Sequence, residues 1–133
     1  PPAPGVPLNQ MGSAVEPLSL GGAVRYAHEA AGVPVLVTEH GMSTADDTLR
    51  AGFIEPSLRG LLDVMDAGVP VLGYLHWTLM DNFEWADGWK GRFGLYRVDF
   101  ADPERPRSRT RSADLYAFLL WQFGEPGFQP GSR

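Results

Sequence analysis

A mostly apolar run from 69 to 77 leads directly into a segment in which two carboxylates lie between aromatic rings. The run has the length and composition of a buried β-strand. Asp81 and Glu84 follow it, and the indoles of Trp77 and Trp85 flank them within nine residues. Carboxylates accept hydrogen bonds from hydroxyl groups and flat rings cover apolar C–H faces, so this combination suits a sugar. The alternative is a core strand followed by a loop with a capping Asp.

A second strand is predicted upstream of this segment. Residues 33–38 form a short, apolar, β-branched run, which is the pattern of a strand buried on both faces. Glu39 stands at its carboxyl end and Gly41 follows. In a parallel α/β barrel, catalytic groups project from this end of a strand. Glu39 is therefore a candidate catalytic residue, and the alternatives are an ordinary loop acid or a cap for the next helix.

Two helices are predicted around the upstream strand. Pro17 can occupy the first position of one helix, which ends at Gly32. Residues 43–47 supply capping groups for the other, which closes at Gly68 and either kinks or restarts at Pro56. Their apolar stripes repeat at four, three and four residues: Leu20, Val24, Ala27 and Ala31, then Ile54, Leu58, Leu61 and Met65.

The C-terminal third contains an extended segment and a last helix. Residues 92–100 alternate apolar and polar side chains and are predicted to be extended. Arginines then fall on every second position, and a solvated face is favoured over a phosphate site because acidic residues lie close by: Arg105, Arg107, Arg109 and Arg111. Ser112 is predicted to cap the last helix. Residues 115–123 leave almost no polar face, so this helix is either covered on several sides or exposed.

Several motifs together resemble one enzyme family. Residues 73–100, GYLHWTLMDNFEWADGWKGRFGLYRVDF, resemble the C-terminal signature of the glycoside hydrolase family 1 β-glucosidases, usually written GYFxWSLLDNFEW followed by RFGLxxVD. Upstream, TEHG at residues 38–41 is similar to the family's nucleophile motif TENG, with His40 in place of Asn. Asp46, Asp47 and Arg50 resemble the DDxxR that follows that motif in the family. Each motif is weak by itself, but the ordered set is highly specific.

The resemblance implies an α/β fold that is the C-terminal part of a (β/α)₈ TIM barrel, with the last two barrel strands and their helices. A complete barrel needs roughly 200 to 250 residues or more, so a chain of 133 residues is incomplete as a barrel. The absence of an initial Met fits either a fragment or a processed chain. We expect residues 11–124 to form this part of the barrel, after an extended Pro-rich segment at 1–10 and before a frayed tail at 125–133.

The same resemblance implies roles for five residues. Glu39 is the nucleophile of retaining hydrolysis. Trp77 is the stacking floor of the glycone pocket, Glu84 accepts from the O4 and O6 hydroxyls, Trp85 donates its indole N–H toward O3, and Phe93 closes the pocket near O6. The family's acid/base lies in a TFNEP-like motif, which this sequence lacks. The expected function is hydrolysis of terminal β-D-glucosides, or related β-glycosides, with the acid/base supplied by a missing N-terminal part.

Composition excludes several other classes. The net charge of −5 and the pI near 5.0 argue against nucleic acid as a partner. No apolar run reaches the roughly 18 residues of a membrane span. Cysteine is absent, and the three histidines have no partner at i+4, so no metal site is predicted. No cofactor is expected. No signal-peptide pattern opens the chain, which leaves its location open with the cytoplasm favoured.

The expected partners are a carbohydrate substrate and either the upstream half of the barrel or a second copy of this chain. The isolated chain is expected to be inactive, because two strands cannot close a barrel and their edges stay open. Two hypotheses from other classes remain. One is a non-catalytic half-barrel that binds sugar through Trp77, Glu84 and Trp85, and the other is a structural piece that self-associates.

Overall fold

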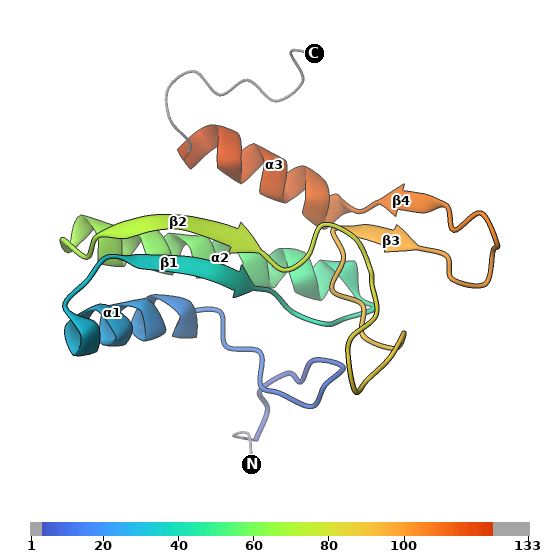
Figure 1. The fold of residues 1–133 in the computed structure, drawn as a ribbon, viewed down its shortest axis with the longest axis horizontal. Coiled ribbons are helices and arrows are strands. Elements are labelled where there is room, and N and C mark those ends of the chain that lie inside the picture. Colours follow the sequence, from blue (N-terminus) through green and yellow to red (C-terminus); the bar gives the residue numbers. More distant parts are fainter. Residues whose placement is uncertain (1–3, 124–133) are drawn as a thin grey trace.

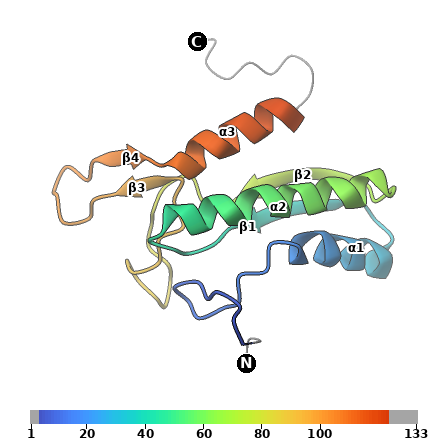
Figure 2. The ribbon, with the colours of Figure 1, turned by 180° about the vertical axis from the view of Figure 1, so that it is seen from behind.

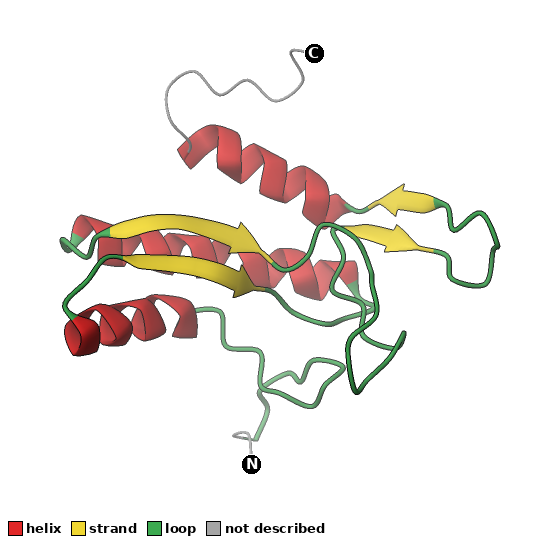
Figure 3. Ribbon diagram, in the orientation of Figure 1, coloured by secondary structure: helices red, strands yellow, loops and turns green. Residues whose placement is uncertain are grey.

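The structure, a computed structural model, describes residues 4–123, and the tail predicted at 125–133 lies outside this range. Residues 4–123 form three helices and four strands, and helices alternate with strands from α1 to β2 (Figures 1 and 3), which confirms the predicted α/β class. In chain order they are α1 (Ser19–Ala31), β1 (Val35–His40), α2 (Asp47–Asp66), β2 (Val71–His76), β3 (Tyr96–Val98), β4 (Arg107–Arg109) and α3 (Arg111–Phe123).

The two longer strands form a parallel pair. β1 and β2 are hydrogen-bonded neighbours, and Val35 pairs with Val71 while His40 pairs with His76. The helix α2 connects them and lies across one face of the pair, with α1 beside it (Figure 2). The core between these elements is made of small and branched apolar side chains: Leu20, Val24, Val37, Leu61, Val64 and Val69. Both strands therefore end at the same edge of the sheet.

The other side of the β1–β2 pair is uncovered within residues 4–123. Leu36 is 48% exposed, Leu72 is 70% exposed and Leu75 is 56% exposed. The prediction that residues 33–38 are buried on both faces is therefore wrong, and so is the burial predicted for the run that contains Leu72. A parallel sheet becomes a two-sided core only when elements cover both faces, and α1 and α2 cover one.

The helix predictions are correct in part. Gly32 adopts the left-handed conformation that ends α1, and Asp46 caps α2 by accepting from the N–H groups of Thr48 and Leu49. The helix α2 runs through Pro56 without restarting. The stripes are buried at Leu20, Val24 and Leu61 in the core against the strands, and at Ile54 and Leu58 in the core against α3, but Ala27, Ala31 and Met65 are exposed. No described element covers those last three.

A β-hairpin leads into the last helix. β3 and β4 are antiparallel, and Tyr96 pairs with Arg109. The helix α3 packs against α2 in a second core made of Ile54, Leu58, Leu95, Ala113 and Leu119. Of the two alternatives for its apolar surface, covered or exposed, the structure of residues 4–123 has the exposed one, at Phe118, Leu120, Trp121 and Phe123. The arginines of β4 are exposed, and Arg109 forms an exposed ion pair with Asp114 at 2.8 Å. Both observations favour the solvated face over a phosphate site.

The cap predicted for α3 is wrong. Thr110, not Ser112, accepts from the N–H of Ala113, at 3.2 Å, and its own hydroxyl donates to the carbonyl of Leu95 at 2.7 Å. Ser112 lies inside the helix, fully buried, where its hydroxyl donates to the carbonyl oxygen of Asp47. Ser112 is a residue type that favours a capping position, but here its hydroxyl bonds to α2 instead.

The described residues form no closed barrel. None of the helices between residues 4 and 123 is long and apolar enough to cross a membrane. The predicted division of the chain at residues 10 and 124 stays a prediction.

Candidate active site

The site begins where the two parallel strands end. Glu39 is the fifth residue of β1, and Trp77 follows β2 directly. The backbone N–H of Trp77 donates to the carbonyl of His40 at 3.0 Å. Gly41 permits this approach, because a Cβ there would lie only 1.7 Å from the carbonyl oxygen of Trp77. The sequence therefore folds here so that Glu39 and Trp77 emerge side by side at the carboxyl edge of the sheet.

The chain after Trp77 is paired with the segment that contains Phe93. Thr78 donates its N–H to the carbonyl of Phe93 at 3.4 Å and accepts from Leu95 at 3.0 Å, while Tyr96 donates to Leu79 at 2.9 Å. This short ladder brings the ring of Phe93 back to the strand ends, although sixteen positions separate it from Trp77. Backbone pairing, and not proximity in sequence, therefore places Phe93.

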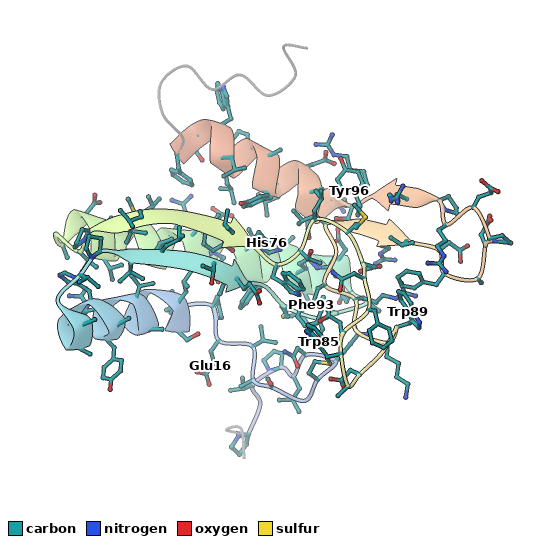
Figure 4. The ribbon with its side chains drawn as sticks, in the orientation of Figure 1. Glu16, His76, Trp85, Trp89, Phe93 and Tyr96 are labelled. Atoms are coloured by element: carbon teal, nitrogen blue, oxygen red, sulfur yellow. The ribbon has the colours of Figure 1, made fainter. Side chains whose placement is uncertain are left out.

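Glu84 and Trp85 lie on a tight turn between these paired segments. Glu84 and Gly88 exchange backbone hydrogen bonds at 2.8 and 3.1 Å. The backbone of Trp85 has a positive φ of 31°, and its side chain is 90% exposed. A Cβ on Gly91 would lie 3.1 Å from Cγ of Glu84 and 3.3 Å from the ring of Phe93, so these two side chains flank the same glycine. Figure 4 shows Trp85 and Phe93 on the loops beyond the carboxyl ends of β1 and β2.

The carboxylate of Glu84 is electrostatically coupled to the strand ends. Burial raises its pKa, and a hydrogen bond from the side chain of Trp77 opposes this shift. The negative charges of Glu39, Asp87 and Asp81 raise the pKa further. Oε1 of Glu84 is buried and has no hydrogen-bond partner among residues 4–123. This site therefore holds an acceptor with unused capacity, beside an indole and close to a second carboxylate.

Asp81 does not belong to this group of side chains. It is buried, and its carboxylate accepts from the N–H groups of Gly94 and Val98, at 2.9 and 3.3 Å, and from the guanidinium of Arg92, at 3.1 Å. These bonds hold the loop after β2 to the start of β3. The structure favours the alternative of a structural Asp after the strand, because every described hydrogen bond of the Asp81 carboxylate is to residues 92–98 of the protein itself.

Arg50 is a second structural anchor. Its guanidinium is buried, donates to Asp47 at 3.0 Å, and donates at 2.7 Å to the carbonyl oxygens of Thr44 and Arg92. It joins the loop after β1 to the loop after β2. The DDxxR motif thus has a physical role, because it ties together the two loops that carry the site.

Sequence reasoning missed a polar cluster behind Glu39. His40 and His76, at the ends of the two strands, both lie within hydrogen-bond distance of the hydroxyl of Tyr74. Burial lowers the pKa of each histidine to about 4, and the charges of His40 and Arg50 contribute at His76. The signal was available: polar side chains at paired ends of neighbouring strands meet. Within the described residues, no cluster of three or more His, Asp or Glu side chains could hold a metal ion.

Comparison with known proteins identifies the family. The sequence model described as Glycosyl hydrolase family 1 matches residues 3–124. The chain belongs to glycosyl hydrolase family 1. This confirms the resemblance of the TEHG and DNFEW segments.

Relatives within family 1 are considerably longer than this chain. The β-galactosidase of Pyrococcus woesei is 39% identical over 107 residues, which cover 80% of this chain and 21% of that protein. The galactolipid galactosyltransferase SFR2, chloroplastic, of Arabidopsis thaliana is 48% identical over 96 residues, or 72% of this chain and 15% of that protein. The chain thus spans about a fifth of the length of the curated relatives it matches.

Solved structures of the family contain the same arrangement. A family 1 β-glucosidase from Thermotoga maritima in complex with isofagomine lactam superimposes with a TM-score of 0.85 at 26% identity. The match covers 94% of this chain and 30% of that one.

Proposed function

We propose that this chain is the C-terminal part of a retaining β-glycosidase, and that it supplies the nucleophile and the glycone pocket. The observation that carries the proposal is the convergence at one sheet edge. Glu39 leaves the end of β1, Trp77 leaves the end of β2, and the charge of Glu39 acts on the half-buried Glu84. A nucleophilic carboxylate beside a polar, ring-lined pocket is the requirement for glycosyl transfer through a covalent intermediate.

In the proposed reaction, the ionised carboxylate of Glu39 attacks the anomeric carbon of a terminal β-glycoside. The bond to the leaving oxygen breaks, and that oxygen takes a proton from an acid on the upstream part of the protein. Water then loses a proton to the same group and attacks the anomeric carbon from the opposite face to Glu39. Two inversions give net retention and free Glu39 again. No cofactor takes part.

The pocket residues have separate tasks in this proposal. The indole of Trp77 covers the apolar face of the sugar, and Phe93 closes the side near O6. The carboxylate of Glu84 takes hydrogen bonds from O4 and O6, and the indole N–H of Trp85 points toward O3. Trp85 is almost fully exposed in this chain, which fits a pocket whose remaining walls come from upstream residues.

In this proposal β1 and β2 are the last two strands of the barrel. The upstream part of the barrel covers their uncovered side. The exposed side chains of Leu36, Leu72 and Leu75 support this, because burying such residues yields roughly 1 kcal/mol or more each. Without that partner the 133-residue chain should be inactive and should self-associate. Sedimentation and an assay with an aryl β-glucoside test both statements. A monomer that hydrolyses the glucoside would contradict them.

Replacement of the nucleophile tests the central claim. In this chain assembled with its upstream part, Glu39→Gln should abolish turnover of an aryl β-glucoside, a loss of many orders of magnitude. Glu29→Gln, on the exposed surface of α1, is the matched control and should leave turnover unchanged. A slowly released 2-fluoro glycoside should leave its mass on the peptide that contains Glu39. Labelling of another peptide, or activity of the Gln variant within tenfold of the parent, would remove Glu39 from this role.

A second pair of variants tests the pocket. Glu84→Ala should weaken discrimination among glucose, 4-deoxyglucose and 6-deoxyglucose glycosides more than Trp85→Phe does, because a carboxylate can accept from two hydroxyls and an indole N–H donates to one. Unchanged discrimination in the Glu84 variant would show that this carboxylate does not bind the sugar. If the assembled parent binds the sugar but turns nothing over, the non-catalytic sugar-binding alternative is favoured.

A further inference from the structure

The hydroxyl of Tyr74 is the centre of the polar cluster behind the nucleophile. It lies 2.9 Å from Nδ1 of His40 and 3.0 Å from Nδ1 of His76, and it reaches the carbonyl oxygen of His40 at 3.2 Å. His40 is the last residue of β1, and Tyr74 and His76 belong to β2. One hydroxyl thus joins the ends of both strands, and the proposed reaction uses none of these three side chains.

One arrangement of protons makes hydrogen bonds of all three contacts of the Tyr74 hydroxyl, while Nε2 of His76 has no partner among residues 4–123. A tyrosine hydroxyl has one proton to donate and can accept two hydrogen bonds. The carbonyl oxygen of His40 can only accept, so the Tyr74 proton points to it, and each imidazole then donates its Nδ1–H to the Tyr74 oxygen. Both histidines are neutral in this arrangement, which agrees with their lowered pKa values of about 4.

The same carbonyl oxygen also links the strands through the main chain. The oxygen of His40 accepts from the backbone N–H of Trp77 at 3.0 Å as well as from the Tyr74 hydroxyl. The peptide group that carries it joins His40 to Gly41, one residue beyond Glu39. Its orientation therefore sets both the direction in which Glu39 leaves β1 and the place of the Trp77 indole beside it.

Helices hold the rings of this cluster from behind. The imidazole of His40 stacks on Phe53 of α2, with ring centroids 4.9 Å apart and planes 16° from parallel. The ring of His76 lies 5.3 Å from that of Tyr116 of α3. The cluster thus connects the strand ends to both helices through ring contacts.

We propose that Tyr74 is a positioning residue, whose hydroxyl fixes the end of β1 against β2 through His40 and so holds the Glu39 carboxylate in place beside Trp77. His40 serves this purpose with Nδ1, which is bonded to Cγ as Nδ2 of an asparagine is. An asparagine at position 40 therefore presents a donor to Tyr74 from the same place. The catalytic part of this proposal rests on the proposed function, but the connection between the strands does not.

Hydrogen exchange in the full 133-residue chain tests the connection. Tyr74→Phe should speed exchange of the Trp77 amide about tenfold, because the His40 carbonyl that accepts from this amide loses its second hydrogen bond, from the Tyr74 hydroxyl. The Leu58 amide in α2 should exchange at an unchanged rate. His40→Leu should have the same effect and His40→Asn should stay within about threefold of the parent. Tyr26→Phe, which removes an exposed hydroxyl from α1, is the control and should change neither amide. No change at Trp77, or an equal change in α2, would overturn the proposal.

Kinetics of the chain assembled with its upstream part test the positioning. Tyr74→Phe should lower kcat at least about tenfold with KM within about twofold, because a displaced nucleophile weakens the transition state more than sugar binding. His40→Asn should restore most of the kcat that His40→Leu loses. Faster exchange at Trp77 without loss of kcat would overturn the positioning role. An inactive parent would count against the proposed function alone, because the exchange result still decides whether Tyr74 connects the strands.

Discussion

The close approach of the two strand ends makes Gly41 the most sensitive position of the site. In Gly41→Ala the new Cβ would lie 1.7 Å from the carbonyl oxygen of Trp77 and 2.8 Å from its carbonyl carbon. Contacts of Cβ atoms are essentially never below 3.0 Å, so the strand ends have to separate by more than about 1 Å. That separation breaks the 3.0 Å hydrogen bond from the Trp77 N–H to His40.

The expected loss of stability follows from these contacts. Overpacking costs about 1 to 3 kcal/mol, and a lost backbone hydrogen bond costs about 1 kcal/mol. Removing a glycine from the unfolded chain offsets about 0.5 to 1 kcal/mol. We therefore expect the free energy of unfolding to fall by about 2 kcal/mol, a large part of a total of roughly 5 to 15 kcal/mol.

Urea unfolding followed by tryptophan fluorescence measures this change. The matched control is Gly22→Ala in α1, where a Cβ would meet nothing within 4 Å, and a helical Gly-to-Ala change should stabilise by about 0.5 to 1 kcal/mol. All variants are compared at one protein concentration, because association shifts apparent stability. A Gly41 variant as stable as the parent would show that the strand ends do not lie this close, and the geometry derived for Glu39 and Trp77 would fail with it.

Three further predictions concern groups that hold the site. Asp81→Ala should lower the free energy of unfolding by about 3 kcal/mol, because it leaves two buried backbone N–H groups without their acceptor. His40 and His76 each have a pKa near 6.5 in the unfolded chain and about 4 in the folded chain, so the unfolded chain binds more protons as the pH falls. The free energy of unfolding should therefore fall by about 2 kcal/mol per histidine from pH 7 to 4.5. Thr110→Ala should cost about 1 to 2 kcal/mol as a lost cap, whereas Thr48→Ala should cost little.

Each of these predictions has an outcome that would contradict it. An Asp81 variant that unfolds with the parent would show that Gly94 and Val98 find other acceptors. A pH profile as steep in His40→Asn as in the parent would mean that His40 is not the group that titrates. Equal effects of the Thr48 and Thr110 variants would remove the special role of the cap.

Much of the local structure follows from residues that are close in sequence. Asp46 caps α2 because its carboxylate reaches N–H groups two and three positions ahead, and Gly32 ends α1 because it alone tolerates the left-handed conformation there. The stripe of α2 is correctly predicted at Ile54 and Leu58, where spacing alone decides which side chains share a face. The family and the strand-end place of Glu39 also follow from short motifs read in order.

The sequence alone does not decide what covers an element once it has formed. Leu36 and Leu72 have the side chains of a core strand, yet both are exposed because nothing between residues 4 and 123 lies over them. Asp81 and Glu84 are three residues apart and chemically alike, but tertiary pairing makes one a loop anchor and leaves the other with a free acceptor.

The cluster around Tyr74 shows the same division. Each of its members is ordinary in sequence, and its chemistry exists only because β1 and β2 are parallel neighbours whose ends pair at His40 and His76. The Asp46 cap and the spacing of the stripes depend on atoms within one or two turns, so the sequence determines them, whereas at Ser112 a tertiary contact replaces the expected cap. Burial, pKa values and the pairing of His40 with Tyr74 depend on atoms that are distant along the chain, so only the tertiary structure decides them.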